Sequence, residues 1–170
     1  MLDGMIDFAE ELQRLMSTPS DGVAPTALDF LVQVHVSCVE GASAVLKRVR
    51  GLLSLVIRYR LEHPPDDEIE PNPNPFAVPE EYWKAVLPSW FLDCTPFLSA
   101  AKPSSAWTVE GWLYWFLSTY EDRDWRWYSV SVASPSRFTV TLQVTDLPFA
   151  WEALRWALFA AGATSAEWQW

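Results

Sequence analysis

Two stretches of this chain alternate between apolar and polar residues, which is the spacing of a strand with one buried face. In residues 30–38 every second side chain is apolar, and the side chains between them are polar apart from Leu31. The same alternation returns in residues 138–145. The apolar positions are Phe30, Val32, Val34, Val36 and Cys38 in the first stretch and Phe138, Val140, Leu142 and Val144 in the second.

Each predicted strand is followed by apolar residues at helical spacing, so residues 30–60 and 138–168 overlay as two pseudo-repeats at a constant offset of 108 residues. We expect each copy to be a β-α-β unit. The closing strand of the first copy is predicted at Leu55–Leu61. That of the second is predicted at Thr164–Trp170, after a helix stop at Gly162. The helical stripes are Val45, Leu46, Val49 and Leu53 in the first copy and Ala153, Leu154, Ala157 and Ala161 in the second.

Two more elements complete the predicted architecture. Trp125–Ala133 is typical of a strand that meets the second copy through a turn at Ser134–Ser136, and Met1–Met16 has the spacing of an amphipathic helix with acids in its first turns. This order predicts an α+β fold, a ferredoxin-like sandwich built from the two β-α-β pseudo-repeats. We expect one domain over residues 1–170, divided into an N-terminal helix (1–20), a first β-α-β unit (30–62), an insertion (63–122) and a β-β-α-β unit (124–170).

The predicted insertion combines proline, tryptophan and acidic residues. Prolines fix φ and remove backbone donors, so His63–Pro75 is expected to be an extended loop. Two or three short helices are expected after it, beginning near Pro79, Trp90 and Thr108. Most of their apolar residues are aromatic, among them Tyr82, Trp83, Trp112, Trp115 and Phe116.

Composition and charge exclude several classes of protein. The chain has 170 residues, 50% of them hydrophobic, and a formal net charge of −10. Nucleic acids and anionic membranes are bound mainly through Lys and Arg, so we expect neither as a partner. Cys38 and Cys94 form no CxxC pair and the N-terminus lacks the features of a signal peptide, which together favour a cytoplasmic location.

Nearly all of the excess acid lies in the insertion. Residues 61–122 carry eleven acidic and two basic residues, a net charge of −9, whereas residues 1–60 carry −1 and residues 123–170 carry zero. One interpretation is that the insertion covers the sheet, with its tryptophans in the core and its acids as solvated surface. We favour recognition of a basic partner, because clustered charge steers such a partner and Tyr and Trp are enriched at binding hot spots. The predicted contact residues are Asp66, Asp67, Glu68, Glu70, Glu80, Glu81, Tyr82 and Trp83.

Other chemistry receives little support from the sequence. A metal site from His35, Cys38 and Cys94 would need side chains from opposite faces of one strand, and nothing local supports a Cys94–histidine nucleophile pair. We therefore expect no metal and no cofactor. Phosphate-loop, dinucleotide, nucleophile-elbow, EF-hand and zinc-protease motifs are absent. Carboxylates near aromatic residues could serve a hydrolase, and these are Glu110, Glu121, Asp122 and Asp124.

One basic cluster runs against the overall charge. Five of the twelve basic residues fall within fourteen positions, and they are Lys47, Arg48, Arg50, Arg58 and Arg60. We expect these cations to pair with the chain's own acids, with an anion-binding site as the alternative.

In size, charge and composition the whole chain is similar to bacterial toxin-immunity proteins, although no family motif carries the likeness. That resemblance implies a non-enzymatic protein that covers the active site of a basic toxin domain. We expect a monomer or a weak homodimer. The alternative is a small-molecule-binding or regulatory α+β module that uses the polar strand faces, and a carboxylate-dependent hydrolase is the weaker alternative. The polar positions for the module are Gln33, His35, Thr141 and Gln143.

Overall fold

The computed structural model describes residues 8–17, 30–63, 80–117, 123–145 and 147–169. Its centre is a four-stranded antiparallel sheet in the order β2-β3-β1-β4. The strands are β1 (Phe30–Cys38), β2 (Trp125–Ser134), β3 (Arg137–Val144) and β4 (Ala163–Gln169). Since each neighbour is antiparallel, β1 and β2 run in the same direction with β3 between them, and β3 and β4 do so with β1 between them.

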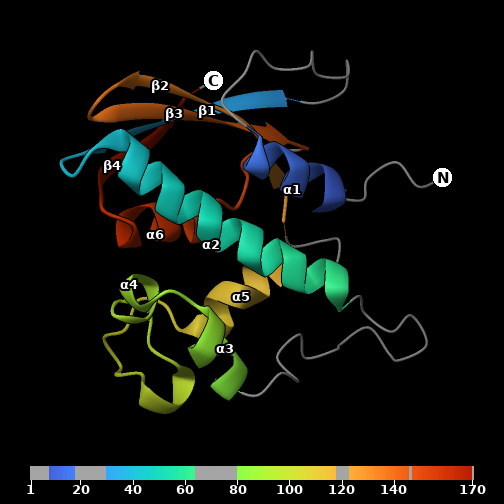
Figure 1. Cartoon of the computed structure of the whole chain (residues 1–170), viewed down its shortest axis with the longest axis vertical. Helices are drawn as coiled ribbons and strands as arrows, with labels where there is room; N and C mark the ends of the chain where they lie inside the picture. Colours follow the sequence, from blue (N-terminus) through green and yellow to red (C-terminus); the bar gives the residue numbers. More distant parts are fainter. Residues whose placement is uncertain (1–7, 18–29, 64–79, 118–122, 146, 170) are drawn as a thin grey trace.

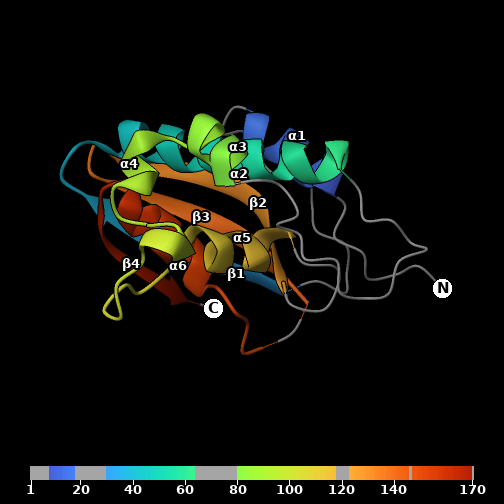
Figure 2. The same cartoon turned by 90° about the horizontal axis from the view of Figure 1, so that it is seen from below.

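Two helices cover one face of this sheet (Figures 1 and 2). They are the long helix α2 (Ala42–Glu62), which follows β1, and α6 (Glu152–Ala160), which connects β3 to β4. The sheet directs its apolar positions toward them, and Val34 lies opposite both Val140 and Trp168. The alternation that predicts β1 and β3 therefore marks the core face correctly, apart from Phe30, which is exposed.

The remaining helices extend this arrangement on two sides. Helix α1 (Phe8–Met16) packs on α2 and β2. The insertion lies on the side of α2 and α6 away from the sheet (Figure 1), so the molecule has three layers. The insertion elements are α3 (Glu80–Val86), α4 (Ser89–Leu92), the 3-10 helix η1 (Leu98–Ala100) and α5 (Val109–Leu117).

Much of the predicted secondary structure is confirmed. The α+β class, the β2–β3 hairpin and the helical stripes of α2 and α6 are all present, and every stripe residue is buried. Gly162 follows α6 with a φ of 109°, a left-handed conformation that favours glycine and stops the helix. Strand β4 begins at Ala163, one residue before its predicted start, and Trp170 lies outside the described residues.

The strand predicted at Leu55–Leu61 is wrong, because this segment is the C-terminal half of α2. Its apolar residues alternate, but they also continue the helical stripe, since Val56, Ile57 and Tyr59 are buried while Leu61 is exposed. A short apolar run satisfies both periods, and length decides between them. The first pseudo-repeat, residues 30–60, therefore contains one strand and one helix. The strand that returns after α2 is β2, beyond the insertion.

The tryptophans of the insertion attach it to the rest of the molecule. Trp83 and Trp112 are buried, as the covering interpretation expects, and Trp90, Trp107 and Trp115 pack half-buried against the same core. Trp112 also donates a hydrogen bond from Nε1 to the Ala153 carbonyl oxygen at 2.9 Å. The insertion is thus held by aromatic packing on α2 and α6.

Candidate functional site

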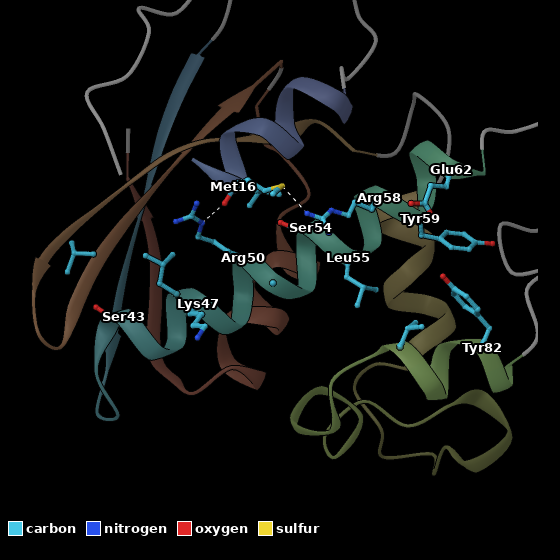
Figure 3. Close-up of a pocket in the computed structure, with 15 residues that line it drawn as sticks. Met16, Ser43, Lys47, Arg50, Ser54, Leu55, Arg58, Tyr59, Glu62 and Tyr82 are labelled. Carbon is cyan, nitrogen blue, oxygen red and sulfur yellow. Dashed lines mark hydrogen bonds between the residues drawn. The ribbon is translucent and has the colours of Figure 1, made fainter. Parts of the chain in front are cut away.

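A groove of about 810 Å³ follows the outer surface of α2 between α1 and α3 (Figure 3). Met16 of α1 and Val86 of α3 both line it. Figure 3 shows these two helices on opposite sides of α2, whose solvent-facing side forms the floor. The groove joins two features that the sequence singled out. Tyr82, a predicted contact residue, lies at one end, and members of the basic cluster lie along the floor.

The α3 side of the groove rests on a cluster of aromatic rings, of which only the Tyr59–His63 pair is stacked. Tyr59 of α2 lies at the centre, with ring-centroid distances of 4.3 Å to His63, 4.7 Å to Trp83 and 5.5 Å to Tyr82. Trp83 is 2% exposed, whereas Tyr82 is 38% exposed. Burial, and to a smaller degree the neighbouring Tyr82, raises the pKa of the Tyr59 hydroxyl. Adjacent residues of α3 therefore have different roles. Trp83 anchors the helix in the core, and Tyr82 faces the groove.

Two carboxylates lie at the start of α3. Glu80 accepts hydrogen bonds from Lys84 Nζ at 2.7 Å and from Ser99 Oγ at 3.0 Å, and these two donors lower the pKa of its carboxyl group. Glu81 is 3.5 Å from Lys84 Nζ, but its side chain is 82% exposed. Glu80 thus forms its hydrogen bonds within the insertion, whereas the carboxylate of Glu81 is exposed to solvent beside Tyr82.

The structure brings together only part of the predicted contact set. Glu80, Glu81 and Tyr82 lie next to one another at the surface of α3. Trp83 belongs to the core, so its indole offers almost no surface to a partner and we do not carry it forward as a contact. Four predicted contacts lie outside the described residues, and these are Asp66, Asp67, Glu68 and Glu70.

The α1 side of the groove is held by a buried ion pair. Glu11 Oε1 accepts from Arg123 Nη2 and from the Trp127 backbone N–H, the latter at 2.7 Å. The two charged side chains are 0% and 3% exposed. The Arg123 guanidinium also lies over the rings of Phe116 and Trp125. The pair therefore fixes α1 to the start of β2 and to α5.

Three of the five clustered cations contact other parts of the chain or are buried in it. Arg48 bonds Glu40 Oε2 at 2.9 Å and the Ala161 carbonyl at 3.0 Å. Arg50 donates to the carbonyl oxygens of Leu15 and Ser17, where cations favour the C-terminal end of a helix dipole. Arg60 is buried. Pairing with acids, the expected use, is thus shown for Arg48, while Arg50 uses backbone carbonyls.

The other two cations, Lys47 and Arg58, lie in the groove. Neither forms an ion pair with a carboxylate among the residues that the structure describes, and Arg58 donates to the Met16 sulfur at 3.0 Å. Gly51 lies between them on the same side of α2 and is exposed. The anion-binding alternative therefore has a location, which is the floor of the groove.

Two of the four carboxylates considered for a hydrolase, Glu110 and Asp124, lie within the described residues. Glu110 Oε2 accepts the Leu98 backbone N–H at 2.8 Å, which is a structural contact within the insertion. Asp124 precedes β2, and its carbonyl oxygen accepts from the Thr145 backbone N–H. Glu121 and Asp122 lie outside the described residues.

The described residues contain no group of three or more His, Cys, Asp or Glu side chains that could hold a metal ion. Cys38 is buried, and Cys94 is exposed with a thiol whose pKa is raised, chiefly by desolvation. His35 Nδ1 is 3.1 Å from Thr139 Oγ1 on the sheet face opposite the helices. On the same face, Gln143 is buried and accepts from both Arg14 and Arg126.

No family model, no curated protein and no solved structure matches the chain. Within the described ranges, no helix is both long enough and apolar enough to cross a membrane. The functional argument therefore rests on the residues and their geometry.

Sequence reasoning missed the floor of the groove because it assigned the second half of α2 to a strand. If Arg58 lay on a strand and Lys47 on the helix before it, the sequence would not define where the two side chains lie relative to each other. On one helix they are eleven residues apart, which is close to three full turns, and they share a face. Gly51, in the middle of an apolar periodic run, was a signal for a special position.

Proposed function

We propose that this protein is a non-enzymatic binding protein that neutralises a basic protein partner, in the manner of bacterial toxin-immunity proteins. The observation that supports the proposal best is the surface of α3, where the exposed carboxylate of Glu81 adjoins the half-exposed ring of Tyr82. The ring of Tyr82 packs against the buried pair of Tyr59 and Trp83, so its position is set before a partner arrives. We refer to Glu80, Glu81 and Tyr82 as the α3 edge.

The two kinds of side chain contribute differently to such binding. An aromatic ring on a fixed base supplies apolar area at low entropic cost, and tyrosine is enriched among hot-spot residues. Carboxylates at the rim change the association rate and the choice of partner more than the affinity. A net charge of −9 over residues 61–122 extends this attraction beyond the α3 edge. The partner expected here is a protein with a basic cleft.

Three further proposals accompany this function. The strand order and the two helices on one face are consistent with a ferredoxin-like sandwich, which we propose as the fold within the α+β class. We propose a cytoplasmic location. We also propose that the unbound chain is a monomer or a weak homodimer.

The test is capture of a basic partner on the immobilised chain, followed by assay of what is captured. The double variant Glu81→Lys, Tyr82→Ala changes the two residues of the α3 edge that face solvent. The control Glu167→Lys makes the same change of charge on β4, away from α3 (Figure 1). Wild type and Glu167→Lys should retain the same basic protein at low salt, and the double variant should lose it. Added wild-type chain should also inhibit the activity of the captured protein.

Equal retention by all three proteins would contradict the proposal, as would a partner that is acidic or whose activity is unaffected by the chain. Thermal unfolding of each variant shows whether the surface changes leave the fold intact. The Glu81 side chain is exposed and the Tyr82 ring is half-exposed, so we expect changes within about 0.5 kcal/mol for Glu81→Lys and below about 1 kcal/mol for Tyr82→Ala.

A further inference from the structure

We propose that the groove over Gly51 docks an acidic amphipathic helix from a partner protein. This surface goes beyond the proposed function, because its charge is opposite to that of the α3 edge. Three independent features of the described residues carry the proposal, namely the glycine, the shape of the groove and the placement of its cations.

Gly51 is the first feature. Glycine in a helix interior costs roughly 0.5–1 kcal/mol relative to alanine, yet it occupies the middle of the 21-residue helix α2. Packing does not explain it, because a Cβ placed on Gly51 would meet no atom within 4 Å. An exposed glycine on the floor of a groove leaves room for another backbone to approach closely. The missing side chain is therefore explained by something that lies against α2 at this position.

The shape of the groove is the second feature. It extends along α2 from Ser43 to Glu62, a length of about 28 Å at 1.5 Å per residue. Met16 of α1 and Val86 of α3 line it, and these two helices lie on opposite sides of α2, with Leu55 on the floor (Figure 3). An open trough with apolar sides and this length matches a helix that inserts one apolar face. Small ligands more often occupy enclosed pockets.

Charge is the third feature. Lys47 and Arg58 lie on either side of Gly51 along α2, about 16 Å apart along the axis. Neither forms an ion pair with a carboxylate of the described residues, in a chain with a formal charge of −10. A docked helix that carries acids at the same spacing would meet both cations. A nucleic acid is disfavoured, because the whole chain would repel its phosphates.

The test uses a fluorescein-labelled helical peptide of about 18 residues, with leucines on one face and two glutamates at the spacing of Lys47 and Arg58. Its matched control has lysines in place of these glutamates. Anisotropy should show binding of the acidic peptide and at least about tenfold weaker binding of the basic one. The protein variant Lys47→Glu, Arg58→Glu should reverse this preference, while Lys102→Glu, an exposed residue before α5, should leave it unchanged.

A second variant tests the groove itself. Gly51→Leu places a side chain on the floor, and its Cβ would meet no atom within 4 Å, so we expect the variant to fold and to bind the acidic peptide about tenfold or more weakly. Thermal unfolding checks that the variant remains folded.

Three results would overturn the proposal. The first is equal binding of the acidic and basic peptides, or no binding of either. The second is equal binding of a scrambled, non-helical acidic peptide, which would assign the groove to anions in general. The third is a concentration-dependent dimer in sedimentation that Gly51→Leu abolishes, which would assign it to a second copy of this chain. The single variant Glu81→Lys, at a residue that does not line the groove, should bind the acidic peptide like wild type, so failure of this proposal and failure of the proposed function are distinguishable.

Discussion

Helices α1 and α3 line opposite sides of the same groove, but they are attached to the molecule by different physical means (Figure 3). The attachment of α1 is polar, since Glu11 is buried against Arg123 and Arg50 caps the last carbonyls of the helix. The attachment of α3 is aromatic. Its Trp83 packs on Tyr59, and the indole Nε1 has no hydrogen-bond partner among the described residues.

The difference determines how each side responds to change. A buried ion pair that loses one partner leaves the other charge in a dry environment, which is costly. An aromatic contact that loses a ring leaves a cavity that its neighbours can partly fill. We therefore expect the α1 side to fail more sharply than the α3 side, although both contact the same helix.

The largest effect is expected when the α1 attachment is broken. Glu11→Ala leaves the Arg123 guanidinium buried and without its carboxylate, so the free energy of unfolding should fall by about 3–5 kcal/mol. Urea unfolding measures this loss. The control is Glu10→Ala, since Glu10 is one turn away from Arg14 in a partly exposed pair and should cost about 0.5 kcal/mol. Similar losses in the two variants would show that the buried pair does not anchor α1.

The α3 attachment is tested by two neighbouring aromatic residues. Trp83→Ala should lower the free energy of unfolding by about 3 kcal/mol, the low end for a buried tryptophan, because no hydrogen bond from Nε1 to the described residues is lost. Tyr82→Ala, at the next position but exposed, should cost less than about 1 kcal/mol. A larger loss of stability in Tyr82→Ala than in Trp83→Ala would show that Tyr82, not Trp83, anchors α3.

The floor between the two sides should respond in the opposite direction. Gly51→Ala should raise the free energy of unfolding by about 0.5–1 kcal/mol, because the helix gains propensity and the new methyl group meets nothing. Gly162→Ala, with a φ of 109°, should instead lower it, since alanine is strained there. Melting temperatures of both variants check the contrast. Destabilisation by Gly51→Ala would mean that α2 needs its glycine for folding.

The smallest effect concerns pH at the start of α3. The donors Lys84 and Ser99 lower the folded-state pKa of Glu80 below its ordinary value near 4.5. Its contribution is therefore present above about pH 4.5 and is lost as pH falls through the lowered pKa. The stability difference between wild type and Glu80→Gln should shrink on acidification over that window. Glu81→Gln is the matched control, and an equal pH dependence in both variants would contradict the assignment.

The sequence predicts much of the fold because its strands and most of its helices bury one face at a clear period. Val32, Val34 and Val36 alternate toward the core, and Gly162 ends α6 as predicted. The second half of α2 escapes because Leu55–Leu61 satisfies the period of a strand as well as that of a helix. Only the length of the helix, which depends on what it packs against, decides between them.

The candidate site is less predictable, since it depends on contacts between residues far apart in the chain. Glu11 looks like an acid that complements a helix dipole, yet it is buried against Arg123, 112 residues later. Trp83 and Tyr82 are neighbouring aromatic residues of one short helix, and only the packing of α3 on α2 decides that Trp83 is buried and Tyr82 is half-exposed. Lys47 and Arg58 become a feature of one groove only once α2 is continuous.

The most direct test of the account is the dissociation constant of the purified basic partner, measured for wild type, Glu81→Lys and Glu167→Lys at low and high salt. We predict that wild type and Glu167→Lys bind alike and weaken with salt, because screening reduces the attraction of exposed charges. Glu81→Lys should bind the partner about tenfold more weakly than wild type at low salt, and its affinity should fall less than that of wild type when salt is added. If Glu81→Lys instead bound as tightly as Glu167→Lys, with the same salt dependence, the α3 edge would not be the surface that recognises the partner.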